Sequence, residues 1–374
     1  MNSEKIEITY VFGFGRSDLI LSNEKFANDF FYGYFNFLTK YKNIKFIEFD
    51  DNNKSLFSII SKILRKLSKL SFFIENICSF KNFGKLWKSD HIIATNDRIG
   101  ISLMPFLIIY KLFNVNKTSV IVMGLLAKET KNIFSHIFQR LLLNIFFYLC
   151  SNFIFLSKSE LIQAQVSYKR FKHKFHFIPF CVDTDFWKKD ENEIFNRNKI
   201  IFVGNDGRRE YDLVLKIAKE LPEYEFLVIT SNIDSSELLS QNVELVKGSW
   251  NKRILSDDDL KKYYQQSLLS IIPIKNTYQP SGQSVALQSM AMGVPVMISD
   301  TIGFWDKEMF RDGDNIFFAT DNSLNTWVES IKNIIDNHKI KNLVSENGYK
   351  TVNEFYNSEF FYDSLENVLF KPLN

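Results

Sequence analysis

The stretch QPSGQSVALQSMAMGVPV, residues 279–296, places a proline and small residues directly before a helical pattern and an apolar strand. Pro280 restricts the turn, Gly282 removes a side chain where a ligand can approach the backbone, and Ser281 is a candidate helix cap. Free N–H groups at a helix start attract anions, so this order of residues predicts a phosphate cradle. The candidate ligand-binding residues of this stretch are Ser281, Gly282, Gln283, Ser284 and Gln288.

Two of these residues extend the predicted site along the helix. Ser284 and Gln288 stand four apart and therefore share one helical face. A ligand group one turn beyond the phosphate would meet the Gln288 amide. The alternative is a tight strand-to-helix turn that binds nothing, and it stays open at this point.

A second glycine-containing loop, VGNDGRREYD at residues 203–212, also follows an apolar strand and precedes a helix. It carries Arg208 and Arg209, and planar guanidinium groups match phosphate oxygens with paired hydrogen bonds. Gly204 and Asn205 are the first residues of this loop, and they are further candidate ligand-binding residues. The alternative is a solvated basic turn whose charge is balanced by the acidic residues beside it.

Candidates in the first half of the chain also follow expected strands. Asp97 comes after the strand HIIAT and is a candidate general base or sugar-steering residue. The loop GFGR brings Gly13 and Gly15 to the end of the first strand. Parallel sheets bind ligands at such strand ends. Asp97 is equally consistent with a helix cap, and the glycines with a plain turn.

Strands and helices are expected to alternate along the chain, with the candidate residues at the strand ends. In the second half, the apolar runs 199–204, 224–230, 243–248, 268–274, 294–300 and 315–319 predict strands, and 210–221, 257–267, 323–337 and 339–355 predict helices. The first half alternates too, with a helix expected over 23–41. Alternation of this kind predicts an α/β fold of two doubly wound, Rossmann-like parallel sheets facing a cleft.

The segment 174–199, polar and charged after residue 182, is interpreted as the connection between two domains. We expect residues 1–182 and 183–355 to form one Rossmann-like domain each. The family resemblance given below implies that the first binds the acceptor and the second the nucleotide sugar. Residues 356–374 are expected to pack back on the first domain.

Composition narrows the function classes. The 374 residues hold 46 Lys and Arg against 43 Asp and Glu, a net charge of +3, which argues against a protein that coats nucleic acid. Cys78, Cys150 and Cys181 are far apart and suit a reducing compartment. Glu4 and Glu7 interrupt what would be a signal-peptide core, so the N-terminus is interpreted as a strand of a cytoplasmic protein.

No metal is expected. The sequence has no DxD motif between apolar strands, and the acidic run at 257–259 is better explained as the first turn of a helix, where carboxylates suit the helix dipole.

One segment combines charge and apolar periodicity. Residues 54–88 contain eight Lys or Arg and one Glu, with apolar residues at helical spacing. Its cations Lys62, Arg65, Lys66 and Lys69 predict contact with an anionic membrane surface, or else a domain helix with a solvated face. The most apolar run, 141–156, is interpreted as a buried helix followed by a strand.

Taken together, these stretches resemble the family-4-like (group 1) glycosyltransferases, which have the GT-B fold. FIPFCVDTDFW (177–187), VGNDGRREYD, QPSGQSVALQSMAMGVPV and RDGDNIFF (311–318) resemble the family's interdomain segment, donor-phosphate loop, donor-binding motif and following strand. The first half matches in its layout and in FLSKSE (155–160). The resemblance implies transfer of a sugar from a nucleotide diphosphate sugar, with retention and without a further cofactor.

This sequence departs from the family's pattern at two positions. The family motif has two glutamates eight apart, where this chain has Pro280 and Gln288. The resemblance implies a ribose contact for Gln288 and a diphosphate contact for Arg209, with Arg208 as the alternative. The missing glutamates leave the identity of the sugar open.

The expected protein is therefore a hexosyltransferase of cell-envelope polysaccharide or glycolipid synthesis, peripheral on the cytoplasmic face of a membrane. Its acceptor would be the hydroxyl of a lipid, a lipid-linked saccharide or a polysaccharide. Two rival classes stay open: a catalytically silent nucleotide-sugar-binding protein, and a nucleotide-sugar epimerase of the same build.

Overall fold

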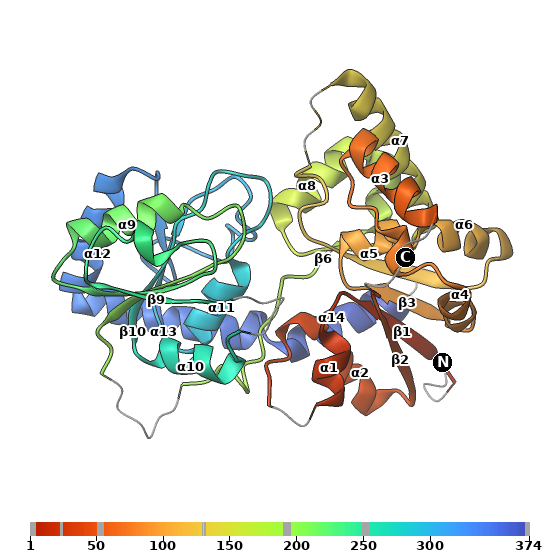
Figure 1. The fold of residues 1–374 in the computed structure, drawn as a ribbon. Coiled ribbons are helices and arrows are strands. Elements are labelled where there is room, and N and C mark those ends of the chain that lie inside the picture. The colour runs from red at the N-terminus through yellow and green to blue at the C-terminus, as the bar shows by residue number, and fades with distance from the viewer. Residues whose placement is uncertain are drawn as a thin grey trace. The chain divides into compact units, whose positions relative to one another are not determined.

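The computed structural model describes residues 5–22, 25–50, 56–128, 130, 132–189, 196–248 and 254–370. They form two compact units, each built on one sheet (Figure 1). The first unit takes the described residues within 1–24, 31–179 and 361–374, and the second takes those within 25–30 and 180–360. The short segment 25–30 thus belongs to the second unit, although it lies within the first half of the sequence.

The first unit contains a six-stranded parallel sheet in the order β2-β1-β3-β4-β5-β6. Its strands are β1 (Glu7–Phe12), β2 (Asn43–Glu48), β3 (His91–Ala94), β4 (Lys117–Val122), β5 (Asn152–Phe155) and β6 (Phe175–Phe177). Ile8 of β1, the second strand in this order, pairs with Ile44 of β2 on one side and His91 of β3 on the other. Strands β3 and β5 are buried along their whole length, as expected of a sheet covered on both faces.

The second unit contains another six-stranded parallel sheet, in the order β12-β11-β10-β7-β8-β9. Its strands are β7 (Lys199–Val203), β8 (Glu225–Ile229), β9 (Val243–Val246), β10 (Ser267–Ile272), β11 (Val296–Ser299) and β12 (Phe317–Ala319). Chain order reverses between β7 and β10, and the two loops that carry the candidate phosphate residues follow these neighbouring strands. Open α/β sheets bind ligands at such a reversal.

Helices connect the strands of both units. The first unit has α1 (Arg16–Leu21), α2 (Tyr34–Lys40), α3 (Leu56–Ser68), α4 (Phe80–Trp87), α5 (Asp97–Ser102), α6 (Met104–Phe113), α7 (Ile133–Leu149) and α8 (Lys158–Ser167). The second has α9 (Tyr211–Glu220), α10 (Asp257–Gln265), α11 (Gln283–Ala291), α12 (Leu324–Asp336) and α13 (His338–Phe355), and α14 (Ser358–Phe370) runs from the second unit into the first. The predicted α/β class with two doubly wound sheets is confirmed.

Two sequence-based expectations about local structure are wrong. The helix expected over 23–41 is replaced, within the described residues, by an extended stretch, a 3-10 turn (Asp29–Phe31) and α2. Tyr32 and Gly33 both have positive φ angles, 51° and 77°, which interrupt a helix. Residues 175–177, expected to belong to the connection between domains, form β6 beside β5.

The apolar run 141–156 forms the end of α7 and strand β5, as predicted, but α7 is buried on only one side. Leu143, Phe146 and Phe147 are buried, whereas Leu141 is 55% and Tyr148 53% exposed. Within the described residues, none of the helices has the length and apolarity that crossing a bilayer would take.

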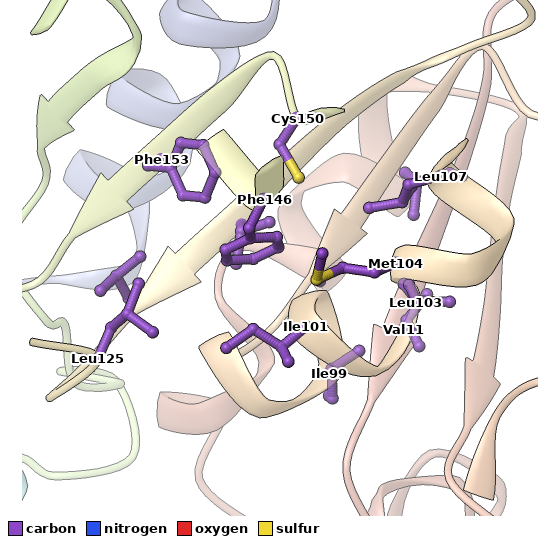
Figure 2. Packing of buried hydrophobic residues seen from close by; sticks show 14 of the residues in the cluster. Val11, Ile99, Ile101, Leu103, Met104, Leu107, Leu125, Phe146, Cys150 and Phe153 are labelled. Atoms are coloured by element: carbon purple, nitrogen blue, oxygen red, sulfur yellow. The ribbon is translucent and has the colours of Figure 1, made fainter. Parts of the chain in front are cut away.

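The core of the first unit packs one side of its sheet against α5, α6 and α7 (Figure 2). Ile99 and Ile101 of α5 and Phe146 of α7 are fully buried in this core. Gly100 lies where the helix meets the sheet, and a Cβ there would come within 2.8 Å of Val120 Cγ1 and 2.9 Å of Phe146 Cζ. The absence of a side chain at residue 100 therefore sets how closely α5 approaches β4.

A pair of glycine substitutions tests this packing. Gly100→Ala should lower the free energy of unfolding by about 1–3 kcal/mol, because the added methyl group overpacks a filled core. Gly84→Ala is the matched control: residue 84 lies in α4 with open space around its Cα, so alanine should raise stability by about 0.5–1 kcal/mol. Urea titrations followed by circular dichroism measure both, and equal effects would contradict the packing argument.

Candidate functional site

The loop after β7 is shaped around the side chain of Arg209. A Cβ at Gly204 would lie 2.5 Å from Arg209 Nε, so only glycine leaves room for the guanidinium. The Gly204 N–H donates to the Ile229 carbonyl at 3.1 Å, which ties the loop to the end of β8. Asn205 Oδ1 accepts hydrogen bonds from Ser231 N at 2.6 Å and Thr230 Oγ1 at 3.2 Å, so this side chain also holds the loop.

Arg209 itself is buried without a full set of partners. Its side chain is only 4% exposed, and neither Nε nor Nη1 makes a hydrogen bond. The nearest carboxylate, Asp206 Oδ2, is 3.6 Å from Nη1 and is itself 42% exposed. Burial lowers the pKa of Arg209, and Asp206 opposes that effect. Because a buried donor without an acceptor costs free energy, this arrangement is typical of a residue that waits for an anion.

The loop before α11 is the second half of the site. Gly282 is the N-cap of α11 with φ +82°, and a Cβ there would meet Ile274 Cδ1 at 2.9 Å. The expectation that Ser281 caps this helix is therefore wrong, because the left-handed Gly282 takes that position. Ser281 Oγ instead lies buried without a hydrogen-bond partner, directly before the free N–H groups of the helix.

The two loops lie against each other. The Lys275 N–H donates to the Arg208 carbonyl at 2.8 Å, and the Glu210 N–H donates to the Pro273 carbonyl at 3.0 Å. Arg208 Nε donates to Gln279 Oε1 at 3.3 Å. The predicted phosphate residues of the two loops are thus brought together in one unit, with Arg208 half-buried at the contact and Arg209 behind it.

The remaining residues of the predicted helix start have different surroundings. Gln283 is 3% exposed, whereas Ser284 is half-buried and lies at the surface of the first helical turn. Gly303, which follows β11, approaches the loop before α11 closely, since a Cβ there would lie 2.3 Å from the Thr277 carbonyl oxygen. Asn276 Oδ1 accepts from the Ile302 N–H at 3.1 Å and fixes this approach.

A pocket opens at the ends of β7 and β8. It lies beside the loop after β7, residues 204–210, which we call the arginine loop. Its walls are formed by Val203, Asn205, Ile229, Gly248, Leu255, Ser256, Asp257 and Leu260. Four of these side chains are aliphatic, and the polar ones lie on the arginine loop and at the start of α10. The pocket therefore combines apolar walls with a few hydrogen-bonding groups, as small-molecule sites do.

Gln288 is placed in the core of the second unit. It is fully buried; its Nε2 donates to Asp29 Oδ2 at 2.7 Å and its Oε1 accepts from the Tyr264 hydroxyl at 3.3 Å. Asp29 also accepts from Trp187 Nε1 at 2.9 Å and from the Asp183 N–H at 2.6 Å. These bonds hold the segment 25–30 to α11, and the ribose contact of Gln288 stays a prediction that requires them to change.

No pattern in the sequence singled out Asp29. It is 1% exposed, and burial raises its pKa to about 7 against the lowering effect of the hydrogen bonds from Gln288, Asp183 and Trp187. The surrounding sequence, NEKFANDFF, looks like an ordinary helix with a surface carboxylate. Only the tertiary fold carries this carboxylate next to the position where the resembled family has a glutamate.

The backbone N–H groups that follow the glycine loop of the first unit donate hydrogen bonds to the carboxylate of Glu48. Gly15 has φ +81° and caps α1, and Gly13 lies just before it. Glu48 Oε1 accepts hydrogen bonds from the N–H groups of Arg16 at 2.5 Å and Ser17 at 3.3 Å. The helix end that would attract a phosphate is thus already bound to an anion, so these glycines serve the turn in this structure.

Asp97 forms an ion pair with Lys128. It begins α5, which is capped by Asn96, and its Oδ2 accepts from Lys128 Nζ at 2.8 Å. Nearby, the fully buried Glu160 accepts from the N–H groups of Gly124 and Leu126 at 2.8 and 2.9 Å. Burial raises the pKa of Glu160 to about 7. FLSKSE, the segment of Glu160 noted in the sequence, therefore contributes a structural carboxylate.

The acidic run 257–259 forms the first turn of helix α10. Ser256 caps α10 through the Asp259 N–H at 3.1 Å, and Asp257 Oδ2 accepts from the Ala27 N–H at 3.0 Å. Across the described ranges, no group of three or more His, Cys, Asp or Glu is arranged to hold a metal ion.

Comparison with known proteins identifies the family of the second unit. Residues 183–351 match the family model described as "Glycosyl transferases group 1". This part of the chain is a group 1 glycosyltransferase domain. The protein is accordingly a glycosyltransferase, as the resemblance implied. No curated protein matches the sequence.

Solved structures show the fold of the whole glycosyltransferase. Anabaena HepE, solved with UDP and glucose, is 12% identical with a TM-score of 0.66, covering 98% of this chain and 100% of that one. Sucrose-phosphate synthase from Thermosynechococcus elongatus is 12% identical with a TM-score of 0.69, covering 97% and 98%. A glycosyltransferase from Rickettsia africae is 11% identical with a TM-score of 0.62, covering 98% and 100%. The predicted GT-B fold is confirmed.

Asp29 gives this glycosyltransferase a testable pH dependence. The folded-state pKa of about 7 exceeds the ordinary 3.8, so the native protein holds this proton more tightly and the contribution to stability falls as pH rises across that interval. Asp29→Asn should flatten this slope, since the uncharged amide still accepts hydrogen bonds. Asp29→Ala should destabilise by about 2–4 kcal/mol at all pH values, because Trp187 and Asp183 lose their acceptor.

Denaturant midpoints measured between pH 4 and 8 provide the test. Glu160 also contributes to this slope, so the quantity to compare is the difference between wild type and variant. Identical slopes for wild type and Asp29→Asn would show that Asp29 does not titrate in this interval.

Proposed function

We propose that this glycosyltransferase moves a hexosyl group from a UDP- or GDP-sugar to a hydroxyl of a lipid, a lipid-linked saccharide or a polysaccharide. The reaction would retain the anomeric configuration and use no metal ion or further cofactor. The observation that carries the proposal is the buried guanidinium of Arg209, whose Nε and Nη1 make no hydrogen bond beside a second loop with the unpartnered Ser281 Oγ. The diphosphate of a nucleotide sugar would complete both.

The chemistry follows from where charge develops. When the bond from the anomeric carbon to the diphosphate breaks, negative charge accumulates on the departing phosphate oxygens. Arg209 would neutralise that charge, and Ser281 Oγ and the N–H groups at the start of α11 would donate to it. Since these groups are already in position, they stabilise the transition state without reorganising. Arg208, tied to Gln279, is assigned a supporting position at the edge of the same site.

The nucleoside would occupy the pocket at the ends of β7 and β8. Its aliphatic walls suit the face of a base, and the Asp257 carboxylate and Ser256 hydroxyl can bond the polar edge. Asn205 belongs both to this pocket and to the arginine loop, so base and diphosphate would lie on either side of one loop. UDP bound to the structurally similar HepE supports a uridine donor.

Retention is supported by the state of Asp97. An inverting transfer needs a free base to take the acceptor proton. Asp97, the candidate that the sequence offered, is 8% exposed in its side chain and paired with Lys128 at 2.8 Å. In a retaining transfer the acceptor proton can instead leave with the diphosphate. Separation of the product anomers by proton NMR measures the outcome.

The location of the acceptor is part of the same proposal. A lipid or lipid-linked acceptor would bring the protein to the cytoplasmic face of a membrane, in the synthesis of a glycolipid or cell-envelope polysaccharide. The exposed Lys62, Lys66 and Lys69 of the basic segment support an anionic surface as partner. Arg65 is turned inward, with its guanidinium 4.4 Å from the Phe73 ring and 3.7 Å from Glu75, and is not part of that contact.

Replacing Arg209 separates function from stability. Arg209→Met keeps a long side chain but removes a buried guanidinium whose Nε and Nη1 make no hydrogen bond. Its ion partner Asp206 is 3.6 Å away and 42% exposed, so the free energy of unfolding should stay equal or rise. Turnover of UDP- and GDP-sugars with a lipid extract should fall by about 10²–10³-fold, the effect of removing one preorganised donor. Arg209→Lys should lose most of this activity as well, since an ammonium lacks the paired geometry.

The control is Lys219→Met on the exposed side of α9, which should leave nucleotide release and stability unchanged. Retained activity in Arg209→Met would remove Arg209 from the diphosphate site. Loss of activity together with loss of folding would assign Arg209 a structural role instead.

A further inference from the structure

Helix α3 in the first unit packs on the core with Leu64 but also turns two serines inward. Its two buried residues are serines, Ser61 and Ser68, both fully buried. Ser61 Oγ donates to Glu75 Oε2 at 2.5 Å and accepts from the Ile74 N–H at 3.0 Å. Its exposed residues include Leu56, Phe57, Ile59, Ile60 and Ile63, between 39% and 73% exposed. A helix that packs on a core of a soluble domain shows the reverse pattern.

Helix α7 presents a second apolar face. On one side Leu143, Phe146 and Phe147 enter the core. On the other side, exposed apolar residues recur at helical spacing, with only His136, Arg140 and Asn144 among them. These residues are Ile133, Phe134, Ile137, Leu141, Ile145 and Tyr148, from 36% to 79% exposed.

A third helix extends this surface. In α6, Ile108, Ile109, Leu112 and Phe113 are 38% to 79% exposed. Lys111 Nζ lies 5.6 Å from the centre of the Tyr148 ring and joins the outer sides of α6 and α7. Both α3 and α6 pack against α7 (Figure 1). The exposed apolar residues thus lie on helices that neighbour α7, and we call the exposed apolar residues of α3, α6 and α7 the apolar face.

The charges around the apolar face have one sign. The sequences of α3, α6 and α7 contain no Asp or Glu. They carry Lys62, Lys66, Lys111 and Arg140, all exposed, and Lys69 follows α3 directly. A wide apolar area edged by cations matches the interior and the anionic headgroups of a bilayer. We propose that the apolar face docks this protein on an anionic lipid bilayer, with the outer side of α7 entering the acyl region.

A second copy of the chain fits this face less well. In a two-fold dimer the same surface contacts itself, so the cations of α3, α6 and α7 would face like charges. These helices offer no carboxylate to pair with them, and like charges brought together oppose association. An anionic lipid surface supplies many such partners. The proposal rests on the proposed function in one respect, that the acceptor is held in the same bilayer.

Three serine substitutions test the docking surface. Phe134→Ser, Ile137→Ser and Leu141→Ser together remove apolar side chains that are 55% to 64% exposed, so the first unit should fold as before. Binding to phosphatidylcholine vesicles containing phosphatidylglycerol, measured by co-sedimentation, should fall about a hundredfold or more. Lys62→Glu with Lys66→Glu should also weaken binding, by about tenfold or more, and only to the vesicles that contain phosphatidylglycerol.

The matched control removes exposed apolar residues from the second unit. Leu239→Ser, Ile340→Ser and Leu343→Ser, which are 41% to 50% exposed in the parent, should leave vesicle binding unchanged. Unchanged co-sedimentation of the α7 variant, or equal losses in variant and control, would overturn the proposal. So would a wild-type dimer in the ultracentrifuge that ignores vesicles and dissociates in the α7 variant, or a monomer that ignores vesicles.

Stabilisation by UDP in a thermal melt distinguishes this proposal from the proposed function. A protein stabilised by UDP that does not bind vesicles refutes the docking surface alone. A protein that binds vesicles without a response to any nucleotide refutes the donor site alone.

Discussion

The burial of a guanidinium with unsatisfied donors is the constraint on which the second unit depends. Gly204 gives up its side chain so that Arg209 can lie against the loop, and the backbone of Arg209 forms an isolated bridge with Ile274 of the opposite loop. Burial of this charge carries a desolvation cost, which Asp206 at 3.6 Å offsets without providing acceptors for Nε and Nη1, and an anionic ligand would supply those acceptors. In the proposed reaction, this is the place where the departing diphosphate needs a fixed positive charge.

A second buried charge is handled in the opposite way. Asp29 is surrounded by donors from Gln288, Trp187 and the Asp183 backbone, and its carboxylate is satisfied within the protein. The carboxylate missing at residue 288 thus has a counterpart in Asp29, from another part of the chain, and it holds the segment 25–30 rather than reaching for a ligand. One unit therefore contains an arginine left open to a ligand and an aspartate closed by its own neighbours.

The first unit departs from the usual rule for where polar residues lie. Ser61 faces the core while Ile63 and Ile137 face outward, so burial by the protein alone does not account for the sequence of α3 and α7. A surface of this kind stays exposed in a folded protein only where something other than water covers it. The same unit satisfies its deep charges internally, as the pairing of Glu160 with two backbone N–H groups shows.

Sequence reasoning was enough to predict the α/β class, all six strands of the second sheet and the two loops that carry the candidate phosphate residues. These features follow from local periodicity and from glycine and arginine at strand ends. The sequence could not reveal that Gly282 rather than Ser281 caps α11, since the choice depends on packing against Ile274. Nor could it place Asp29, whose partners are more than 150 residues away. Tertiary structure alone decided which charges are paired and which are left open, because pairing depends on distances between segments that no local pattern encodes.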